Sequence, residues 1–206
     1  MKLIIVRHAE AEHNVGPLMV AHGPSRLTEK GKAQVERVAD RLKNEHIDAA
    51  FTSDAERARD TAQGILQFHP GIALHISEDL RERHMGEMEG KPREEFMAAA
   101  EKSGVKWYEY RPVNGESMLE TRDRAAHFIQ QFRKEYAGKT VLVVSHMGFI
   151  RALLVYLLKQ DYEKDPPIRT VNTGVTIVQM RDDDSHVAHI INDSTHLDEA
   201  TQPTIR

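Results

Sequence analysis

An arginine and a histidine stand side by side at the end of a short apolar run near the start of the chain. The run Leu3–Val6 is too short for a helix and is typical of a strand buried on both faces, as in the middle of an α/β sheet. Arg7 and His8 follow directly, and the carboxyl ends of such strands are where α/β proteins place their ligands. Guanidinium donors match the oxygens of a phosphate, and a neutral imidazole can act as a nucleophile. The pair indicates phosphate chemistry, although a polar strand end would look the same.

Two further patterns in the sequence also indicate phosphate chemistry. Residues 140–145, TVLVVS, read as a second buried strand, and His146 follows it directly. An S-x-x-E pattern at Ser53 and Glu56 predicts a capping box, with a helix from there to about residue 68. Arg57 falls in the first turn of that helix, where free N–H groups and the helix dipole favour an anion. The ordinary alternative is an exposed helix arginine.

The elements that must position these residues follow from apolar periodicity and turn residues. Thr28 suits the N-cap of a helix to about Asn44, and a second capping box at Ser117 and Glu120 opens a helix to Tyr136. The other predicted elements are strands at 48–52 and 73–76, helices at 92–102 and 149–158, and paired strands at 175–180 and 187–191 across the acidic turn 182–184.

The loops give less specific signals. The segment 80–91 carries many charges of both signs, which usually means contact with water. Three aromatic residues crowd positions 107–110; we favour the interpretation that they pin this loop to the core over that of a lid contacting substrate. Pro166-Pro167 marks another loop, and the tail beyond residue 193 has no periodicity, so we expect it to be a loose cover or frayed.

Composition limits the classes of protein. With 206 residues, 40% apolar and 29% charged, the chain suits one ordinary globular domain. The net charge of −4 gives no global positive field, so we expect neither nucleic acid nor an anionic membrane as a partner. There is no cysteine, which excludes disulfides, thiolate nucleophiles and cysteine-ligated metals. The N-terminal apolar run is too short for a signal peptide, and we expect a cytoplasmic protein.

The motifs, taken in order, resemble those of the histidine phosphatase superfamily, which includes cofactor-dependent phosphoglycerate mutases and many phosphatases. The matching segments are Arg7-His8 with Asn14, SDAERARDTA at 53–62, Glu82 in the charged loop, SHMG at 145–148, LTEKGKAQ, GES at 115–117 and NDSTHL. The resemblance implies a phosphoglycerate mutase-like α/β fold: a three-layer α/β/α sandwich with a mostly parallel central sheet. It also implies a single domain over 1–206 with a lid-like insertion around 83–117.

The resemblance assigns roles to individual residues. By this assignment His8 becomes phosphorylated, Glu82 donates a proton to the leaving oxygen, and the phosphoryl oxygens are bound by Arg7, Arg57, His146 and Asn14. Fixed cations around the transferring group are the main catalytic device for such chemistry, so we expect no metal and no cofactor. Other carboxylates compete for the role of the acid: Glu10, Glu12, Glu87 and Glu89.

Two positions depart from the family pattern. Ala9 replaces the glycine usual after the nucleophile, and we expect only a slight shift of the backbone. Met147 replaces a glycine common after the second histidine, and its side chain would narrow the pocket. Met147 and Gly148 are therefore candidate substrate-binding residues.

The sequence favours a phosphatase of a small phosphorylated metabolite over two alternatives. Family mutases carry an arginine pair in the lid, and residues 91–111 hold cations but no adjacent arginines. The segment ERHMG at 82–86 does resemble the mutase loop, so a cofactor-dependent phosphoglycerate mutase stays open, as does a non-catalytic phospholigand-binding protein. A homodimer is compatible with the sequence. A G-x-G-x-x-G motif, a serine elbow and an H-E-x-x-H pattern for His186 and His189 are all absent.

Overall fold

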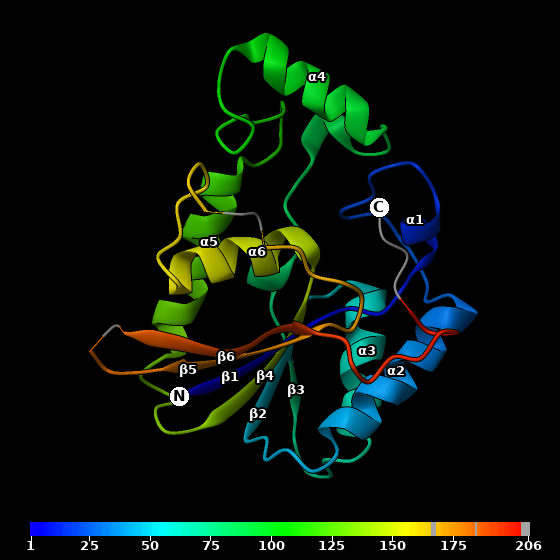
Figure 1. The fold of residues 1–206 in the computed structure, drawn as a ribbon, viewed down its shortest axis with the longest axis vertical. Helices are drawn as coiled ribbons and strands as arrows, with labels where there is room; N and C mark the ends of the chain where they lie inside the picture. The colour runs from blue at the N-terminus through cyan, green and yellow to red at the C-terminus, as the bar shows by residue number, and fades with distance from the viewer. Residues whose placement is uncertain (166–167, 184, 203–206) are drawn as a thin grey trace.

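The computed structural model describes residues 1–165, 168–183 and 185–202, and its centre is a six-stranded sheet of order β3-β2-β4-β1-β5-β6. Strand β5 runs antiparallel to both its neighbours, and the other pairs are parallel, so the sheet is mostly parallel as predicted. The strands are β1 Lys2–Arg7, β2 Ala49–Thr52, β3 Leu74–Ile76, β4 Thr140–Ser145, β5 Val175–Met180 and β6 His186–Asp193. The helices are α1 Glu12–Val15, α2 Glu29–Leu42, α3 Glu56–Leu66, α4 Arg93–Ser103, α5 Met118–Phe132 and α6 Met147–Leu157, with short 3-10 turns at Glu78–Leu80 and Gly86–Met88 (Figure 1).

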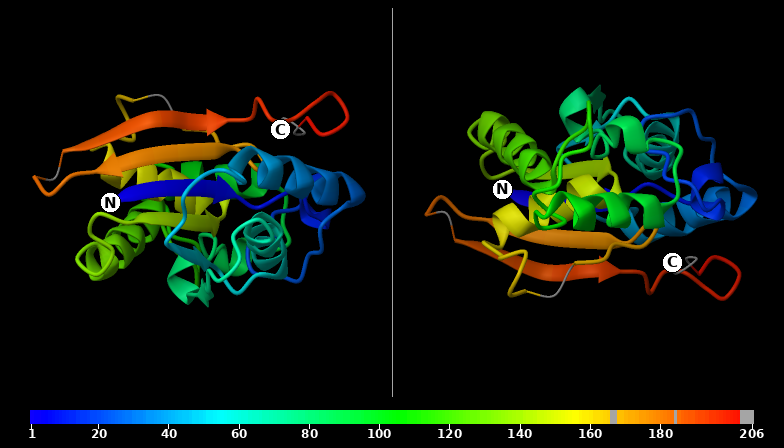
Figure 2. Two further views of the ribbon diagram at one scale, coloured as in Figure 1. Left: turned by 90° about the horizontal axis from the view of Figure 1, so that it is seen from below. Right: turned by 90° about the horizontal axis from the view of Figure 1, so that it is seen from above.

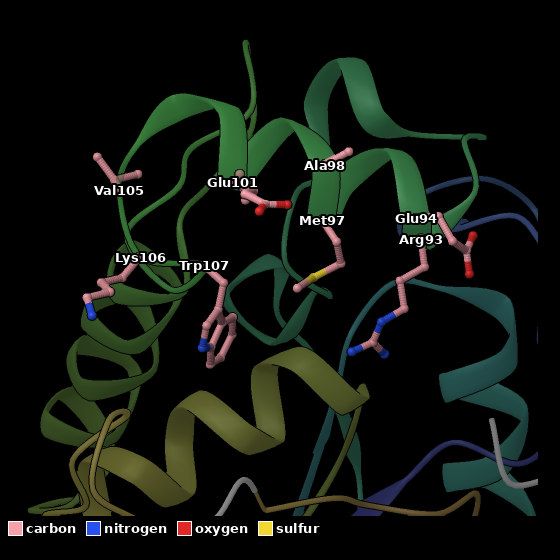
Figure 3. A pocket seen from close by; sticks show the side chains of 9 residues that line it. Arg93, Glu94, Met97, Ala98, Glu101, Val105, Lys106 and Trp107 are labelled. Atoms are coloured by element: carbon pink, nitrogen blue, oxygen red, sulfur yellow. The ribbon is translucent and has the colours of Figure 1, made fainter.

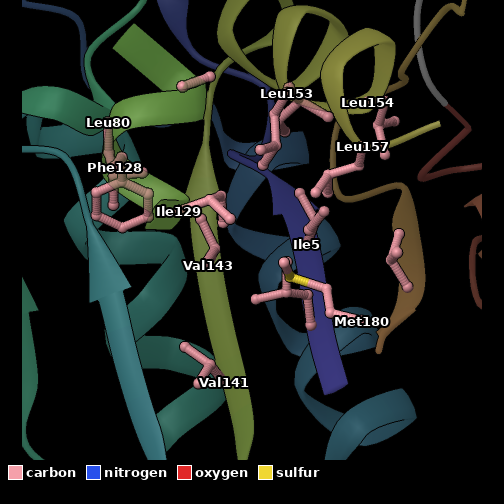
Figure 4. Packing of buried hydrophobic residues seen from close by; sticks show 14 of the residues in the cluster. Ile5, Leu80, Phe128, Ile129, Val141, Val143, Leu153, Leu154, Leu157 and Met180 are labelled. Atoms are coloured by element: carbon pink, nitrogen blue, oxygen red, sulfur yellow. The ribbon is translucent and has the colours of Figure 1, made fainter. Parts of the chain in front are cut away.

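Helices cover both faces of the sheet, which gives the three layers expected from the resemblance (Figure 2). Alternate residues of a strand point to opposite faces. In β1, Leu3 and Ile5 belong to the core shared with α5 and α6, whereas Ile4 and Val6 belong to the core shared with α2 and α3. Figure 4 shows the first of these cores. The continuous apolar runs in β1 and β4 are therefore explained by burial on both sides.

The predicted capping box at Ser53 is wrong. Helix α3 begins at Glu56 with Ala55 as its N-cap, which has no side-chain cap bond. The Ser53 hydroxyl instead lies 2.7 Å from Nε2 of His146. A local pattern cannot reveal that a residue distant in sequence binds the hydroxyl. The second predicted box is confirmed, because Ser117 and Glu120 bond reciprocally at the start of α5.

Other helix boundaries differ slightly from the predicted ones. Helix α5 ends at Phe132 and not at Tyr136, and α6 begins at Met147, two residues before its predicted start. The strand pair 175–180 and 187–191 is confirmed as antiparallel β5 and β6. Pro166-Pro167 and position 184 of the acidic turn lie outside the described residues.

The tail beyond β6 is packed, in contrast to the predicted loose cover. Leu197 and Thr201 are 6% and 3% exposed. Gln34, from α2, donates a hydrogen bond from Nε2 to the carbonyl of Thr201 at 2.9 Å. As far as residue 202, the tail is thus held by α2.

Helix α4 lies apart from the sheet, beyond α6 (Figure 1). The loop after α4 is pinned by aromatic contacts, as we favoured: Tyr108 stacks on Tyr162 with ring centroids 5.2 Å apart. The Arg151 guanidinium lies 4.4 Å from the centre of the Trp107 ring. These contacts attach the α4 region to α6 and to the loop that follows α6.

Candidate active site

Neighbouring strands bring the two predicted histidines together. Strands β1 and β4 are parallel, and Arg7 is paired with Ser145 at their carboxyl ends. The next residues, His8 and His146, therefore leave the same edge of the sheet, and their ring centroids lie 5.1 Å apart. Both side chains are buried, at 2% and 1% exposure.

The hydrogen bonds of His8 define its protonation state. Its Nδ1 lies 2.7 Å from the carbonyl oxygen of Ala9. A carbonyl oxygen only accepts, so Nδ1 carries the proton and a neutral ring has its lone pair on Nε2. Burial, followed by the charges of His146 and Arg57, lowers the pKa of His8 well below its ordinary 6.5. The ring is thus neutral at physiological pH and has a nucleophilic nitrogen.

His146 is held between Arg57 and Ser53. Its Nδ1 accepts a hydrogen bond from the Arg57 guanidinium at 3.4 Å, so Nε2 carries the proton and donates to Ser53 Oγ at 2.7 Å. Burial and then the charge of Arg57 lower the pKa of His146 well below 6.5. Arg57, near the start of α3, is itself only 2% exposed.

The guanidinium of Arg57 also holds a loop over the site. It donates to the carbonyls of Ala21 at 2.6 Å and of Gly23 at 3.4 Å. From the other side, Oε1 of Glu89 accepts the backbone N–H groups of Ala21 at 2.8 Å and His22 at 3.1 Å. This loop is therefore fixed by one cation and one carboxylate.

Arg7 supplies the second guanidinium. Its Nη1 donates to the carbonyl oxygen of Thr170 at 2.7 Å. Burial lowers the pKa of Arg7 to about 10, an effect that Glu82 opposes and Arg57 reinforces. Arg7 consequently stays a cation at neutral pH, next to both the other arginine and the predicted acid.

Glu82 lies against the N-terminus of α6, the helix that His146 caps. Its Oε1 accepts the backbone N–H groups of Arg83 at 2.8 Å and Phe149 at 3.1 Å, and its Oε2 accepts that of Gly148 at 3.1 Å. The first turn of a helix has free N–H groups that favour a carboxylate. The contact places the carboxyl group one turn from His146.

Asn14 belongs to a chain of hydrogen bonds that begins at the backbone carbonyl of His8. Asn172 donates from Nδ2 to the carbonyl of His8 at 2.9 Å and to Oδ1 of Asn14 at 3.2 Å. Asn14 in turn donates to Nε2 of His13 at 2.9 Å, and Nδ1 of His13 lies 2.8 Å from Ser25 Oγ. The network fixes the orientation of the amide group of Asn14.

Comparison with known proteins identifies the family. A model of the histidine phosphatase superfamily (branch 1) matches residues 3–193. The chain belongs to this superfamily. Phosphoserine phosphatase 1 of Hydrogenobacter thermophilus is 30% identical, with 97% of this chain and 95% of the relative covered. The 2,3-bisphosphoglycerate-dependent phosphoglycerate mutase of Brucella canis is 33% identical, with 90% and 95% covered.

A solved phosphatase structure is also similar to this chain in fold. An alpha-ribazole phosphatase from Shigella flexneri superimposes with a TM-score of 0.82 at 26% identity, covering 94% of this chain and 96% of that one. Phosphatases and a mutase are thus both similar to this histidine phosphatase over nearly its whole length.

The sequence missed some residues of this site. His13 is not among the predicted site residues, yet its ring centroid lies 5.6 Å from that of His8, and burial lowers its pKa to about 3. Its place beside Asn14 was the available signal. Asn172 belongs to none of the motifs. It reaches His8 because the chain returns to the site just before β5 begins.

The structure accommodates Ala9 and Met147, the two residues that depart from the family pattern. Ala9 is fully buried, and its N–H donates to Thr61 Oγ1 at 3.0 Å. Met147 is the first residue of α6 and is 41% exposed, so its effect on pocket width stays a prediction. Gly148 contacts Glu82 through its backbone.

A hollow of about 620 Å³ lies on the underside of α4 and includes none of the predicted site residues. Figure 3 shows Arg93, Met97 and Trp107 pointing from α4 and the loop after it toward α6.

Within the described ranges, no group of three or more His, Asp or Glu side chains is arranged to hold a metal ion. His186 and His189 therefore form no such group. No helix in the described part of the chain is long and apolar enough to cross a bilayer.

Proposed function

We propose that this protein is a phosphomonoester hydrolase that works through a phosphohistidine formed on His8. The observation that carries the proposal is the bond from Nδ1 of His8 to Ala9, which leaves a lone pair on Nε2 of a buried neutral ring. A nucleophile held neutral beside two guanidinium groups suits attack on the phosphorus of an anionic ester.

In the first step, Nε2 of His8 bonds to phosphorus as the ester P–O bond breaks. Arg7 and Arg57 contact the equatorial oxygens, where negative charge is stabilised by fixed donors. His146 joins them when its Nε2–H leaves Ser53 for a phosphoryl oxygen. The departing alkoxide takes a proton from Glu82. Oε1 of Glu82 already accepts two N–H groups and Oε2 only one, so Oε2 has a lone pair free for the transferred proton.

In the second step, water attacks the phosphohistidine and Glu82 accepts its proton. The N–P bond breaks, inorganic phosphate leaves, and His8 regains its lone pair with the proton on Nδ1 unchanged. Glu82 regains the proton that the first step consumed, so the cycle balances. The amide of Asn14, held by its neighbours, contributes a further contact to the phosphoryl group.

The substrate we propose is a small phosphorylated metabolite in the cytoplasm. Similar proteins named phosphoserine phosphatase and alpha-ribazole phosphatase support a small phosphate ester as the substrate. The complete absence of cysteine and the small negative net charge are compatible with that setting.

Trapping the intermediate tests the proposal. Rapid acid-free quenching of the wild type with a radiolabelled ester should give a phosphoprotein that is stable in base and labile in acid. His8→Ala should remove both label and turnover, whereas the exposed His127→Ala should keep both. Normal turnover by His8→Ala would refute a phosphohistidine at this position. Binding of the ester with neither covalent label nor phosphate release would indicate a binding protein.

The acid assignment has its own test. Glu82→Gln should slow alkyl phosphates by about 10²-fold to 10⁴-fold, the usual contribution of a general acid. Aryl phosphates with a good leaving group need little protonation, so the first step with an aryl ester, measured as the burst of leaving-group release, should be nearly unaffected. Equal slowing of this first step for both classes would assign the acid to another residue.

A phosphoglycerate mutase is the second candidate, favoured by the relative from Brucella canis. A mutase must keep its bisphosphate intermediate away from water while it reorients. Incubation with 3-phosphoglycerate should release inorganic phosphate with no 2-phosphoglycerate. Isomerisation faster than release would select the mutase.

A further inference from the structure

Arg124, on α5, occupies a central place behind the loop that carries Glu82. Its Nη1 donates to the carbonyl oxygens of Asp79 at 2.6 Å and Arg81 at 3.0 Å. Its Nη2 lies 3.4 Å from the carbonyl oxygen of Glu82 itself. One guanidinium group therefore binds three carbonyls within four consecutive residues, a geometry that the planar fork of an arginine permits.

The remaining donors of Arg124 bind Glu116 as a two-bond pair. Nε lies 2.9 Å from Oε1 of Glu116, and Nη2 lies 2.8 Å from Oε2. The side chains are 19% and 25% exposed, so the pair is partly shielded from water. Burial opposes ionisation of Glu116, but the bonds and charge of Arg124 outweigh it and lower the pKa of Glu116.

Glu116 binds the same loop on the other side of the acid. Its Oε2 accepts the backbone N–H of His84 at 3.0 Å, and its own N–H donates to the His84 carbonyl at 2.8 Å. Its carbonyl accepts from Nε of Arg83 at 2.8 Å. Arg124 thus fixes the backbone at residues 79, 81 and 82, and Glu116 fixes the backbone of His84 and the side chain of Arg83.

Arg124 also contacts α6, the helix whose first turn binds the Glu82 carboxylate. The Arg124 guanidinium lies 5.4 Å from the centre of the Phe149 ring, and the N–H of Phe149 binds the Glu82 carboxylate. Ser145 adds a bond from Oγ to the carbonyl of Leu80 at 2.7 Å. The Glu82 carboxylate is therefore bound to the first turn of α6, and the backbone of its loop is bound by Arg124 and Ser145, which lie beside that turn.

We infer that Arg124, with Glu116, is a positioning residue for the proton-transfer step: it holds the backbone of the loop so that the Glu82 carboxyl group lies at the leaving oxygen. This inference rests on the proposed role of Glu82 as the acid. Arg124 does not contact the phosphoryl group and acts only through Glu82. The pair belongs to the proton-transfer machinery and not merely to the packing of α5.

The test compares alkyl and aryl phosphates in matched variants. Arg124→Gln and Glu116→Gln should each lower kcat for an alkyl phosphate by about 10-fold to 100-fold, the cost of a small misplacement of a catalytic group. With p-nitrophenyl phosphate, the first step, measured as the burst of p-nitrophenol release, should stay within about twofold of wild type in both variants, because that leaving group needs little protonation. Alkyl and aryl esters are compared in this first step, since the second step uses Glu82 as the base with either ester. Arg124→Lys keeps the charge but not the fork and should fall between Arg124→Gln and wild type.

Arg122→Gln is the control on the same helix, since the hydrogen bonds of Arg122 in the described part of the chain go to its neighbour Asp123. It should leave both substrates unchanged. Equal losses for alkyl and aryl esters in the Arg124 and Glu116 variants would overturn the inference, because a structural defect affects both. Circular dichroism and the urea midpoint show whether each variant is folded. If Arg124→Gln does not fold, the same comparison can be made with Glu116→Gln.

A double-mutant cycle separates this inference from the proposed function. If Arg124 acts through Glu82, Arg124→Gln should cost little more in the Glu82→Gln background, so the two effects are not additive. Additive effects would show that Arg124 acts elsewhere and would overturn the inference alone. A Glu82→Gln enzyme that slows aryl and alkyl esters equally would instead refute the acid assignment.

Discussion

At the scale of single residues, the site depends on histidines kept uncharged by burial. Protonation would put a third positive charge next to Arg7 and Arg57 and would remove the lone pair needed for attack. The lowered pKa values of His8 and His146 follow first from burial and then from nearby charges. The same environment that makes the nucleophile reactive therefore makes the fold sensitive to acid.

His13 gives a prediction about stability and pH. Its pKa is about 3 in the folded protein and 6.5 ordinarily, so between these values the unfolded chain binds a proton that the folded one does not. The free energy of unfolding should therefore be fully retained above about pH 6.5 and should fall as the pH decreases toward 3. Replacing His13 by Gln should make this dependence shallower.

Urea midpoints of wild type and His13→Gln at about pH 7.5 and about pH 4.5 measure this difference. The other buried histidines are unchanged in the variant, so the wild type should lose more stability than the variant over the interval. Identical losses would show that His13 is charged in the folded protein.

At the scale of elements, the start of α6 joins three parts of the site. His146 caps the helix, the next free N–H groups bind Glu82, and the helix also contributes to the core through residues such as Leu153. A carboxylate at a helix N-terminus is favoured by the dipole. Glu82, the proposed acid, is thus positioned by the helix that follows the second histidine.

Gly148→Ala should disturb the acid. A Cβ at this position would collide with Oε1 of Glu82, because the backbone of α6 approaches the carboxylate very closely. We expect turnover of an alkyl phosphate to fall by about 10-fold to 100-fold with a folded protein. Gly16→Ala is the matched control, since its Cβ meets no atom within 4 Å. Full alkyl-phosphate turnover by Gly148→Ala would argue against the acid role of Glu82.

At the scale of the whole molecule, the sheet gathers the charges that the chemistry needs. Strands β1 and β4 and helix α3 deliver two arginines and two histidines to one edge, although the residues span positions 7 to 146. The net charge is −4, so the positive charge is local to this edge. Two guanidinium groups can then supply the stabilisation that a metal ion supplies in other phosphoryl-transfer enzymes.

We therefore expect the activity to be insensitive to metal removal. Dialysis against EDTA should leave kcat and KM for a phosphate ester unchanged, because Arg7 and Arg57 bear the stabilising charge. A parallel dialysis without chelator controls for handling losses. Loss of activity that is restored by a divalent cation would contradict this expectation.

The sequence by itself determined the local features of this protein. Continuous apolar runs predicted β1 and β4, because strands buried on both faces need no polar side. The Ser117 box marked the start of α5 since capping depends on residues three positions apart. Ordered motifs identified the family and the residues Arg7, His8, Arg57 and His146.

Only the tertiary structure decided which groups meet. Ser53 carries a capping pattern but contacts His146, and Asn172 reaches His8 without any motif. The Glu82 carboxylate binds the start of α6, more than sixty residues away in the chain. Such contacts depend on strand order and on the path of the chain through space. Those properties arise from the packing of the whole sheet, and no short window of sequence contains them.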